Sequence, residues 1–259
     1  MKTKLTLLLF FGLFAISLQA QDVDEIINNY FENTGGIDKW RSIKAIESHA
    51  KVNQQGMEIP ITMIQLADGK QIMKFQLQGK ELVQMAFDGE VAWGHNFMNM
   101  EPEKKDSETT ENLKRSIGDF PDPFLDYKEK GYTAELLGKE SVEGTECFKV
   151  KLTKTPKLVD GEEKDDIAFY YFDAENFVPL VVEQEIQSGQ FKGQIGRTTF
   201  SDYQEVDGMY FPFSISQGIK DMGSQAITFD TIILNPQVDE SIFKFPGTSA
   251  ATEESEGNK

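Results

Sequence analysis

Cysteine is almost absent from this sequence, in which Cys147 is the only one among 259 residues. One thiol cannot form an intramolecular disulfide, so a folded domain of this chain depends on its hydrophobic core. Because Cys147 lies far from the N-terminus, it is not the acylated first residue of a mature lipoprotein. We therefore expect a domain without disulfides and without a lipid anchor.

Basic residues are also scarce. The chain has 26 lysines and arginines against 43 acidic residues, which gives a formal net charge of −17. Such an acidic chain is a poor partner for phosphate backbones, so nucleic-acid binding is not expected. After residue 20, no apolar run approaches the roughly 20 residues that a membrane-spanning helix needs. The mature chain is therefore expected to be soluble.

The motifs of the common enzyme classes are missing. The sequence contains no G-x-S-x-G elbow, no P-loop, no H-E-x-x-H and no C-x-x-C pattern. Its two histidines, His49 and His95, fall on separate predicted strands, where a histidine is more often a sheet residue than a general base. No residues have the spacing of zinc ligands. We expect a protein without catalytic residues, metal or cofactor.

Two further segments have a functional and a structural interpretation. The acidic residues 160–166 could attract calcium, but they lack the EF-hand spacing and are interpreted as a solvated hairpin turn. Lys149 and Lys151 could lower the pKa of the Cys147 thiol, although an inert thiol is the simpler interpretation. A glycosidase needs a pair of catalytic carboxylates, but this sequence has too many acidic residues for one such pair to be identified.

Residues 1–20 are predicted to be a cleavable signal peptide. Lys2 and Lys4 form a basic start, residues 5–18 are almost entirely apolar, and residues 18–20 fit a signal-peptidase site. Cleavage before Gln21 removes two lysines and no acids, which changes the net charge from −17 to −19. The expected location in a bacterial cell is the periplasm.

The mature chain is expected to begin with helices and continue with strands. Apolar residues recur at helical spacing over residues 23–31, with Asp22 as a possible N-cap, and residues 37–43 predict a second short helix. From about residue 44 the period becomes two, as in residues 72–77. Residues 227, 229, 231 and 233 are expected to share one face of a late strand.

Four Asp-Gly pairs, at residues 68–69, 88–89, 160–161 and 207–208, indicate hairpins. About ten or eleven strands are expected, in one antiparallel sheet that is strongly curved or closed into a barrel. The predicted class is mainly β (α+β), with a single domain over residues 21–247. The acidic tail, residues 248–259, is expected to be disordered.

Residues 101–130 interrupt the strand pattern. Asp106 or Ser107 is a plausible N-cap, and Leu113, Ile117 and Phe120 follow at helical spacing. This segment predicts one or two short amphipathic helices inserted between the two halves of the sheet. An insertion of this length is often a lid or a binding loop, and the alternative is a plug of the barrel end.

Soft apolar side chains are concentrated in the first half of the chain. Six methionines fall between residues 57 and 100, and methionine suits surfaces that accept partners of varying shape. A sheet lined by methionine and phenylalanine beneath a lid predicts a cavity for acyl chains, with ordinary core packing as the alternative for each residue. The predicted cavity and lid residues are Met63, Met73, Phe75, Met85, Phe87, Trp93, Phe97, Leu113, Ile117, Phe120 and Phe124.

Four stretches carry a resemblance to a known family: IINNYF with GGIDKW (26–31 and 35–40), GTECFKVKL (144–152), SDYQEVDGMYFP (201–212) and NPQVDESIFKFP (235–246). With them the sequence resembles the LolA/LolB/LppX superfamily of bacterial lipoprotein and lipid carriers. More specifically, it resembles the LolA-like outer membrane lipoprotein-sorting proteins of the Bacteroidetes type.

The resemblance implies an unclosed antiparallel barrel around a hydrophobic cavity, with short helices as N-terminal cover and lid. It also implies lipid or lipoprotein acyl chains as cargo. The lid segment of this chain is more acidic than the family's, and none of its arginines, Arg41, Arg115 and Arg197, lies in a recognisable lid-latching motif.

Three functions remain open from the sequence. The leading hypothesis is an exported, non-catalytic carrier of acyl chains. The second is an envelope protein-binding or scaffold module with the same fold and a filled core. The third is a hydrolase or lyase with an unrecognised acidic site, for which a loss of activity in His95→Ala would be the evidence.

Overall fold

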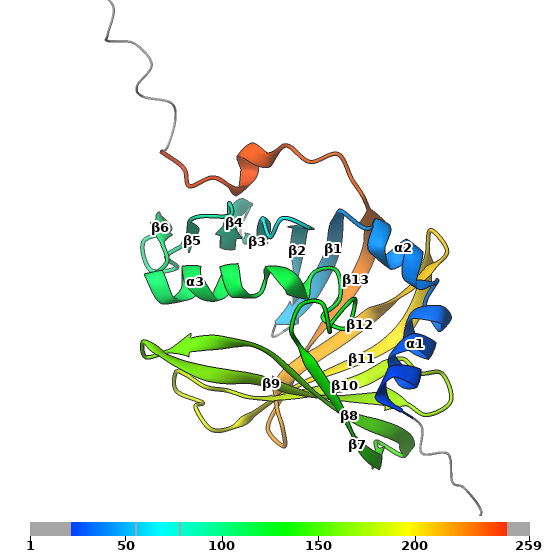
Figure 1. Cartoon of the computed structure of the whole chain (residues 1–259). Helices are drawn as coiled ribbons and strands as arrows, with labels where there is room; N and C mark the ends of the chain where they lie inside the picture. The colour runs from blue at the N-terminus through cyan, green and yellow to red at the C-terminus, as the bar shows by residue number, and fades with distance from the viewer. Residues whose placement is uncertain (1–21, 55, 78, 248–259) are drawn as a thin grey trace, which may run out of the picture.

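The computed structural model describes residues 22–54, 56–77 and 79–247 of the chain. The predicted signal peptide and the predicted disordered tail lie outside these residues. One antiparallel sheet of thirteen strands dominates the fold (Figure 1). Among the described residues, no helix has the length and apolar character to cross a membrane.

The sheet is built almost entirely from hairpins. Its order is β6-β5-β4-β3-β2-β1-β13-β12-β11-β10-β9-β8-β7, so only the β1–β13 contact joins strands distant in sequence. The first six strands are β1 (Ala45–Gln54), β2 (Met57–Leu66), β3 (Gln71–Leu77), β4 (Lys80–Phe87), β5 (Ala92–His95) and β6 (Pro102–Lys104). The others are β7 (Thr133–Val142), β8 (Thr145–Val159), β9 (Glu162–Asp173), β10 (Pro179–Glu185), β11 (Ile195–Val206), β12 (Met209–Ile219) and β13 (Ser224–Leu234).

The sheet is curved but not closed, because its edge strands β6 and β7 do not pair with each other. The predicted mainly β class and the unclosed barrel are therefore confirmed. The expected ten or eleven strands were too few. The short strands β5 and β6, of four and three residues, are too brief to show an alternating pattern, and β6 lies within the segment where no strand was expected.

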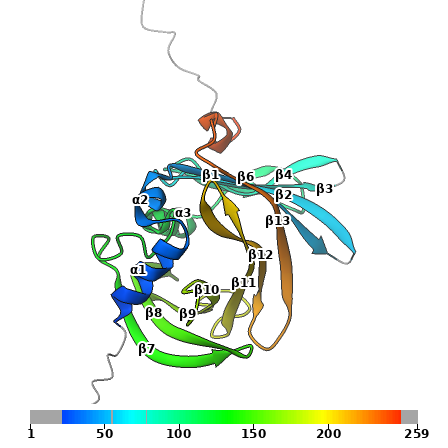
Figure 2. The ribbon, with the colours of Figure 1, turned by 90° about the vertical axis from the view of Figure 1, so that its right-hand side faces the viewer.

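Three α-helices lie on the side where the sheet is open (Figure 2). They are α1 (Val23–Asn33), α2 (Ile37–Ser42) and α3 (Ser107–Arg115). Asp106 caps α3 by accepting a hydrogen bond from the Thr109 amide at 2.6 Å, so it is the N-cap of the two residues, Asp106 and Ser107, that the sequence left open. The single-turn 3₁₀ helix η1 (Ile117–Asp119) follows α3, and together they connect strand β6 to strand β7.

The first two helices cap one end of the half-barrel. Helix α1 buries Ile26, Ile27, Tyr30 and Phe31 as the single stripe that the sequence predicted. Its C-terminus passes so close to the β11–β12 turn that a Cβ on Gly35 would lie 2.8 Å from the Gly208 carbonyl oxygen. This close contact leaves no room for a side chain at residue 35, while Gly36, where a Cβ would meet nothing within 4 Å, adopts a φ of +95° that favours glycine.

The main core lies beneath α1 and α2, on the concave face of the sheet. It joins both helices to the inward-facing residues of β8, β9 and β12 and to residues 124–132. Fully buried aromatic rings dominate it, including Phe31, Phe124 and Phe172. This half of the barrel interior is therefore filled by side chains.

A separate cluster covers the convex face of β2 to β5. The C-terminal segment with the 3₁₀ helix η2 (Glu240–Phe243) crosses this face, so that strands β1 to β6 lie between η2 and α3 (Figure 1). Phe243 is fully buried there, and its carbonyl oxygen accepts a hydrogen bond from the Trp93 indole at 2.8 Å.

All four predicted Asp-Gly pairs occupy hairpin turns. The pairs at 160–161 and 207–208 have positive φ at both residues, as a type I′ turn requires. The prediction for β13 was wrong in part: the pairing with β1 shifts register opposite His49 and Ala50, so residues 227 and 229 face the interior and 231 and 233 do not. A β-bulge of this kind leaves no clear mark in an alternating sequence.

Candidate functional site

Mostly apolar side chains form continuous rows across the concave face of the sheet, from β4 to β11. The strand register places them in three rows, namely Met85–Met73–Met63–Ser48–Ile232, Leu82–Phe75–Ile61–Ala50–Phe229 and Ile59–Val52–Ile227–Ile215–Phe200. Many of these side chains are only half-buried. We call the half-exposed members the trough: Ile59, Ile61, Met63, Met73, Phe75, Met85, Phe200, Ile215, Ile227 and Phe229.

The trough differs from an ordinary sheet face. In a filled core these side chains would be covered, as they are beneath α1 and α2, whereas here ten apolar residues on six strands retain access to solvent. A contiguous exposed apolar surface of this kind marks a binding site in soluble proteins. The trough is therefore the candidate site for an apolar ligand.

Four of the predicted cavity residues, Met63, Met73, Phe75 and Met85, belong to the trough. Phe87 faces the same side but is fully buried. Phe97 lies in the β5–β6 connection and is exposed, with its ring centroid 5.8 Å from that of Phe75. The structure thus brings these predicted residues to one side of the sheet.

Two predicted residues lie elsewhere. Trp93 pairs with Ala86, one residue out of phase with Phe87, so its ring points to the convex face and packs under the C-terminal segment. Phe124 packs against Tyr170 and Phe172 in the main core. Neither side chain belongs to the trough.

The trough residues on β11, β12 and β13 were not among the predicted site residues. Phe200, Ile215, Ile227 and Phe229 come from the last third of the chain, and only the β1–β13 pairing brings them beside β1 and β2. The alternating pattern of β13 was visible in the sequence, but its neighbour in the sheet was not.

Helix α3 is fastened to the sheet by polar side chains at helical spacing. The Asn112 amide exchanges two hydrogen bonds of 2.8 Å with the backbone of Leu158 on β8. Arg115 donates to the Pro156 carbonyl at 2.9 Å, and Glu108 accepts from the Gly161 amide at 2.8 Å. Arg115 thus helps to hold α3, the predicted lid, against β8, and no sequence motif indicated this role.

The other side of the lid contacts the first half of the sheet. Leu113, Ile117 and Phe120, all predicted lid residues, line a small pocket of about 230 Å³ with the β2–β3 turn. The segment from α3 to Phe120 therefore touches both halves of the sheet, as expected of an insertion between them. The contact is tight, because a Cβ on Gly69 would lie 2.4 Å from Cγ1 of Ile117.

We expect Gly69→Ala to loosen the lid. Both Gly69 and Gly89 lie in Asp-Gly turns with positive φ, but a Cβ on Gly89 would meet nothing within 4 Å. Gly69→Ala should therefore lower the free energy of unfolding by about 1–2 kcal/mol more than Gly89→Ala does. Urea denaturation measures both. Adding Ile117→Ala should recover most of the difference, and equal effects of the two glycine substitutions would contradict this contact.

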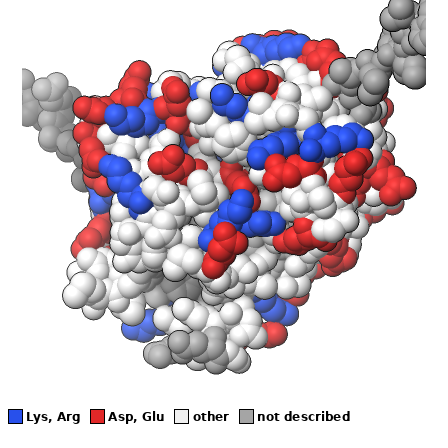
Figure 3. All heavy atoms as spheres, turned by 90° about the horizontal axis from the view of Figure 1, so that it is seen from below, with Lys and Arg blue, Asp and Glu red and all other residues white. Residues whose placement is uncertain are grey.

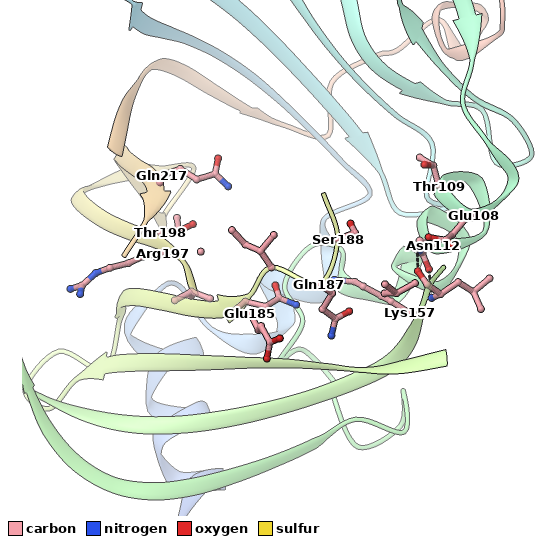
Figure 4. A pocket seen from close by; sticks show the side chains of 17 residues that line it. Glu108, Thr109, Asn112, Lys157, Glu185, Gln187, Ser188, Arg197, Thr198 and Gln217 are labelled. Atoms are coloured by element: carbon pink, nitrogen blue, oxygen red, sulfur yellow. Dashed lines mark hydrogen bonds between the residues drawn. The ribbon is translucent and has the colours of Figure 1, made fainter. Parts of the chain in front are cut away.

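A polar pocket of about 490 Å³ lies between α3 and strands β8 and β10 to β12. Figure 4 shows Thr109 and Asn112 of α3 on one side and Thr198 and Gln217 on the other, with Arg197 pointing away. Arg197 instead pairs with acidic residues on the convex face. The pocket lining is rich in amide and hydroxyl groups, which suits a polar, hydrogen-bonding ligand group.

The polar pocket and the trough are adjacent. Thr198 pairs with Gln217 in the pocket, and two residues along the same strands Phe200 pairs with Ile215 in the trough. Both pairs lie on the same face, because side chains alternate along a strand. The concave face is therefore amphipathic, with an apolar and a polar part next to each other.

A buried network of charges anchors the base of the lid. Lys154 donates to Asp119 of η1 and lies 3.3 Å from Asp166, which is almost fully buried and also lies 2.9 Å from Lys157. Burial opposes the charge of Lys154, but the two carboxylates outweigh it and raise its pKa. The network ties the lid to the floor formed by β8 and β9.

Asp122 is a carboxylate in an unfavourable position. It accepts hydrogen bonds from the Tyr30 hydroxyl at 2.9 Å and the Phe124 amide at 2.8 Å. Burial outweighs these contacts and raises the pKa of Asp122 to about 6. Because the pKa of Asp122 in the folded protein lies above the ordinary 3.8, its protonated carboxyl group contributes stability that is fully present below about pH 4. This contribution is lost as the pH rises through 6.

Asp122→Asn should remove that pH dependence. Through the raised pKa of Asp122, the free energy of unfolding of the parent should fall by about 2–3 kcal/mol between pH 4 and 7. The variant does not lose this stability, so it should be more stable than the parent at pH 7.5 and nearly equal to it at pH 4. Urea denaturation at several pH values measures it. Asp38→Asn is the control, because the Asp38 carboxylate is exposed. An unchanged pH profile in Asp122→Asn would contradict the assignment.

The other chemically active residues have structural partners. The His95 ring accepts a hydrogen bond from the Val83 amide at 2.9 Å, and His49 lies 2.9 Å from Glu47. Cys147 is buried beside Tyr171 and Val181, and burial raises the pKa of its thiol. Among residues 22–247 apart from the two undescribed positions, no cluster of three or more His, Cys, Asp or Glu side chains is placed to hold a metal ion.

Charges on the surface are intermingled. Figure 3 shows acidic and basic side chains next to each other on the face seen from below, without a large area of one sign. Ion pairs such as Arg197–Glu143 and Lys192–Asp160 account for part of this mixing. The face in this view therefore shows no extended continuous stretch of basic side chains.

The unclosed antiparallel half-barrel with its helical insertion is similar in fold to solved structures of LolA-type proteins. A crystal structure of a LolA superfamily protein from Nitrosomonas europaea matches with a TM-score of 0.54 and 13% identity, covering 87% of this chain and 98% of that chain. A putative outer membrane lipoprotein-sorting protein domain from Vibrio parahaemolyticus matches with a TM-score of 0.50 and 13% identity, covering 85% and 94%.

These likenesses confirm at the level of the fold the resemblance drawn from the sequence. No family model and no curated protein matches the chain. At 13% identity a structural likeness shows a shared architecture, so the Bacteroidetes type remains a prediction.

Proposed function

We propose that the protein is a non-catalytic periplasmic carrier that holds the acyl chains of lipids or lipoproteins in the trough. The observation that carries the proposal is the set of ten half-exposed apolar side chains on one concave face, beside a helical lid. The lipoprotein-sorting description of the Vibrio structure supports the same cargo class. Export rests on the predicted signal peptide.

The trough supplies enough apolar contact for this role. Each buried methylene contributes about 0.8 kcal/mol, so an acyl chain of about 16 carbons contributes on the order of 10 kcal/mol before the entropic costs of binding. Methionine and phenylalanine side chains adapt to chains of different length and unsaturation. Binding by burial needs no catalytic group.

The polar pocket supports an amphipathic cargo. Its amide and hydroxyl groups lie two residues along the same strands from Phe200 and Ile215 of the trough. A lipid with its chains on the trough would place its polar part at the pocket. The lid, which contacts both sides, would need to shift from β8 to admit it.

The second candidate is a protein-binding or scaffold module of the envelope with a filled interior. The observation that favours it is the main core, which fills the half of the barrel beneath α1 and α2. In that case the trough would be a packing surface for a protein segment, and lipid would not bind.

Native mass spectrometry of residues 21–259, purified from periplasm without detergent, tests the proposal together with lipid extraction of the same sample. We expect co-purified lipid or lipopeptide at near-integer stoichiometry. An apo mass that stays unchanged after incubation with phospholipids and acylated peptides would exclude the carrier and favour the protein-binding module.

A further inference from the structure

Six connections lie at the same end of the strands. Because neighbouring strands are antiparallel, the connections that follow β1, β3, β5, β8, β10 and β12 share one end of the sheet, and α1 and α2 lie at the other, where Lys39 contacts the β11–β12 turn. We call the described residues of these six connections, with the first residue of the strand after each, the rim. Of the three rows of the concave face, the one from Ile59 to Phe200 lies nearest to the rim.

Exposed apolar side chains are concentrated on the rim. Of the ten large hydrophobic residues that are exposed in the described part of the chain, seven lie there. Met98 is 96% exposed, Met222 64%, Met57 58%, Phe97 54% and Met100 42%, and Phe191 and Ile195 complete the group. The other three, Leu137, Tyr210 and Ile233, lie within strands β7, β12 and β13.

The arrangement of these side chains favours a fluid partner. They stand on four separate connections, and the largest group, residues 97–100, protrudes from a loop next to the edge strand β6. A protein partner would need a complementary cavity for each tip, whereas the interface of a bilayer accepts separate apolar side chains at any spacing. Methionine, the commonest residue of the group, suits such an environment.

The charges of the rim indicate which kind of lipid surface it fits. The rim contains four acidic residues, Glu101, Asp160, Glu162 and Asp221, and three lysines, Lys80, Lys192 and Lys220. Lys192 lies 3.2 Å from Asp160 and Lys220 lies 2.9 Å from Glu183, while Lys80 is exposed. Because the acidic residues of the rim outnumber its lysines, and two of the three lysines are paired with carboxylates, the rim has little attraction for anionic headgroups, and apolar insertion is the main attraction it offers.

We propose that the rim is a docking surface for a zwitterionic lipid bilayer, on which Met57, Met98 and Met222 insert as separate tips and bring the rim end of the trough against the membrane. This inference rests on the proposed function, because it supplies the route by which an acyl chain enters the trough without crossing water. The acidic balance of the rim makes the contact weaker on anionic surfaces.

Flotation with phosphatidylcholine vesicles tests the rim. The parent protein should float with the vesicles, and replacing a third of the lipid by phosphatidylglycerol should not strengthen binding. The triple variant Met57→Ser, Met98→Ser, Met222→Ser should lose at least about tenfold in vesicle affinity. The matched control is Leu137→Ser, Tyr210→Ser, Ile233→Ser, which removes three exposed apolar side chains away from the rim and should bind vesicles as the parent does.

A soluble probe separates this inference from the proposed function. Both triple variants should bind a monomeric fluorescent fatty acid as the parent does, which also shows that they are folded. If the parent binds the fatty acid but not the vesicles, the rim inference fails and the carrier stands. If it binds vesicles and not the fatty acid, the carrier fails. Equal loss in both triple variants, tighter binding to anionic vesicles, or dimers that only the rim substitutions abolish would each overturn the rim inference.

Discussion

Phe75→Glu should abolish acyl-chain binding, with a loss of a hundredfold or more. Phe75 lies in the middle row of the trough, between Ile61 and Leu82 on neighbouring strands. A carboxylate there stays solvated in the empty protein but must lose its water beneath an acyl chain, which costs several kcal/mol. A cost of about 2.8 kcal/mol already corresponds to a hundredfold loss.

The matched control is Gln76→Glu on the same strand. Gln76 is exposed and faces the opposite side of the sheet. The substitution Gln76→Glu therefore adds the same charge without touching the trough. Fluorescence titration with a fatty-acid probe measures binding, and urea denaturation verifies that both variants fold. Parent-like binding by a folded Phe75→Glu protein would show that the trough is not where the chain lies.

Asp166→Ala should lower the free energy of unfolding by about 3–5 kcal/mol. The carboxylate is almost fully buried and contacts Lys154, Lys157 and the Gln184 side chain. Removing this carboxylate leaves the ammonium groups of Lys154 and Lys157 in or near the interior with one remaining carboxylate, that of Asp119. Removing one partner of a buried ion pair costs far more free energy than the intact pair contributes, because the other charge stays buried without compensation. The lid, which Asp119 ties to Lys154, should loosen at the same time.

Asp230→Ala serves as the control for Asp166→Ala. Asp230 also pairs with a lysine, Lys51 at 3.1 Å, but both side chains are exposed, so its removal should cost less than about 1 kcal/mol. Urea denaturation compares the two variants at the same pH. Similar small costs for both would mean that the network around Asp166 is solvated and does not anchor the lid.

The sequence predicts the local elements of this fold well. The stripe of α1, the Asp106 cap of α3 and the four Asp-Gly turns depend on interactions within a few residues, which propensity and spacing capture. The bulge in β13 and the short strands β5 and β6 escape such analysis, because pairing with neighbours rather than local preference creates them.

The candidate site is predicted only in part. Met63, Met73, Phe75 and Met85 alternate along consecutive hairpins, so their shared face follows from the period of two. The prediction placed Trp93 on the wrong face, because a shift of one residue along a strand moves a side chain to the other face of the sheet. The polar pocket and the hold of Arg115 on β8 depend on contacts between distant segments, for which the sequence contains no local signal.

Helix α3 also conceals a strand edge. Strand β8 pairs with β7 only as far as Thr153, so residues 155–159 have no strand on that side, and the Asn112 and Arg115 side chains occupy their backbone groups instead. Any movement that lifts α3 leaves these amides and carbonyls free to pair with a strand of another chain. The open state is thus the one exposed to edge-to-edge aggregation, so the protein gains from spending little time in it.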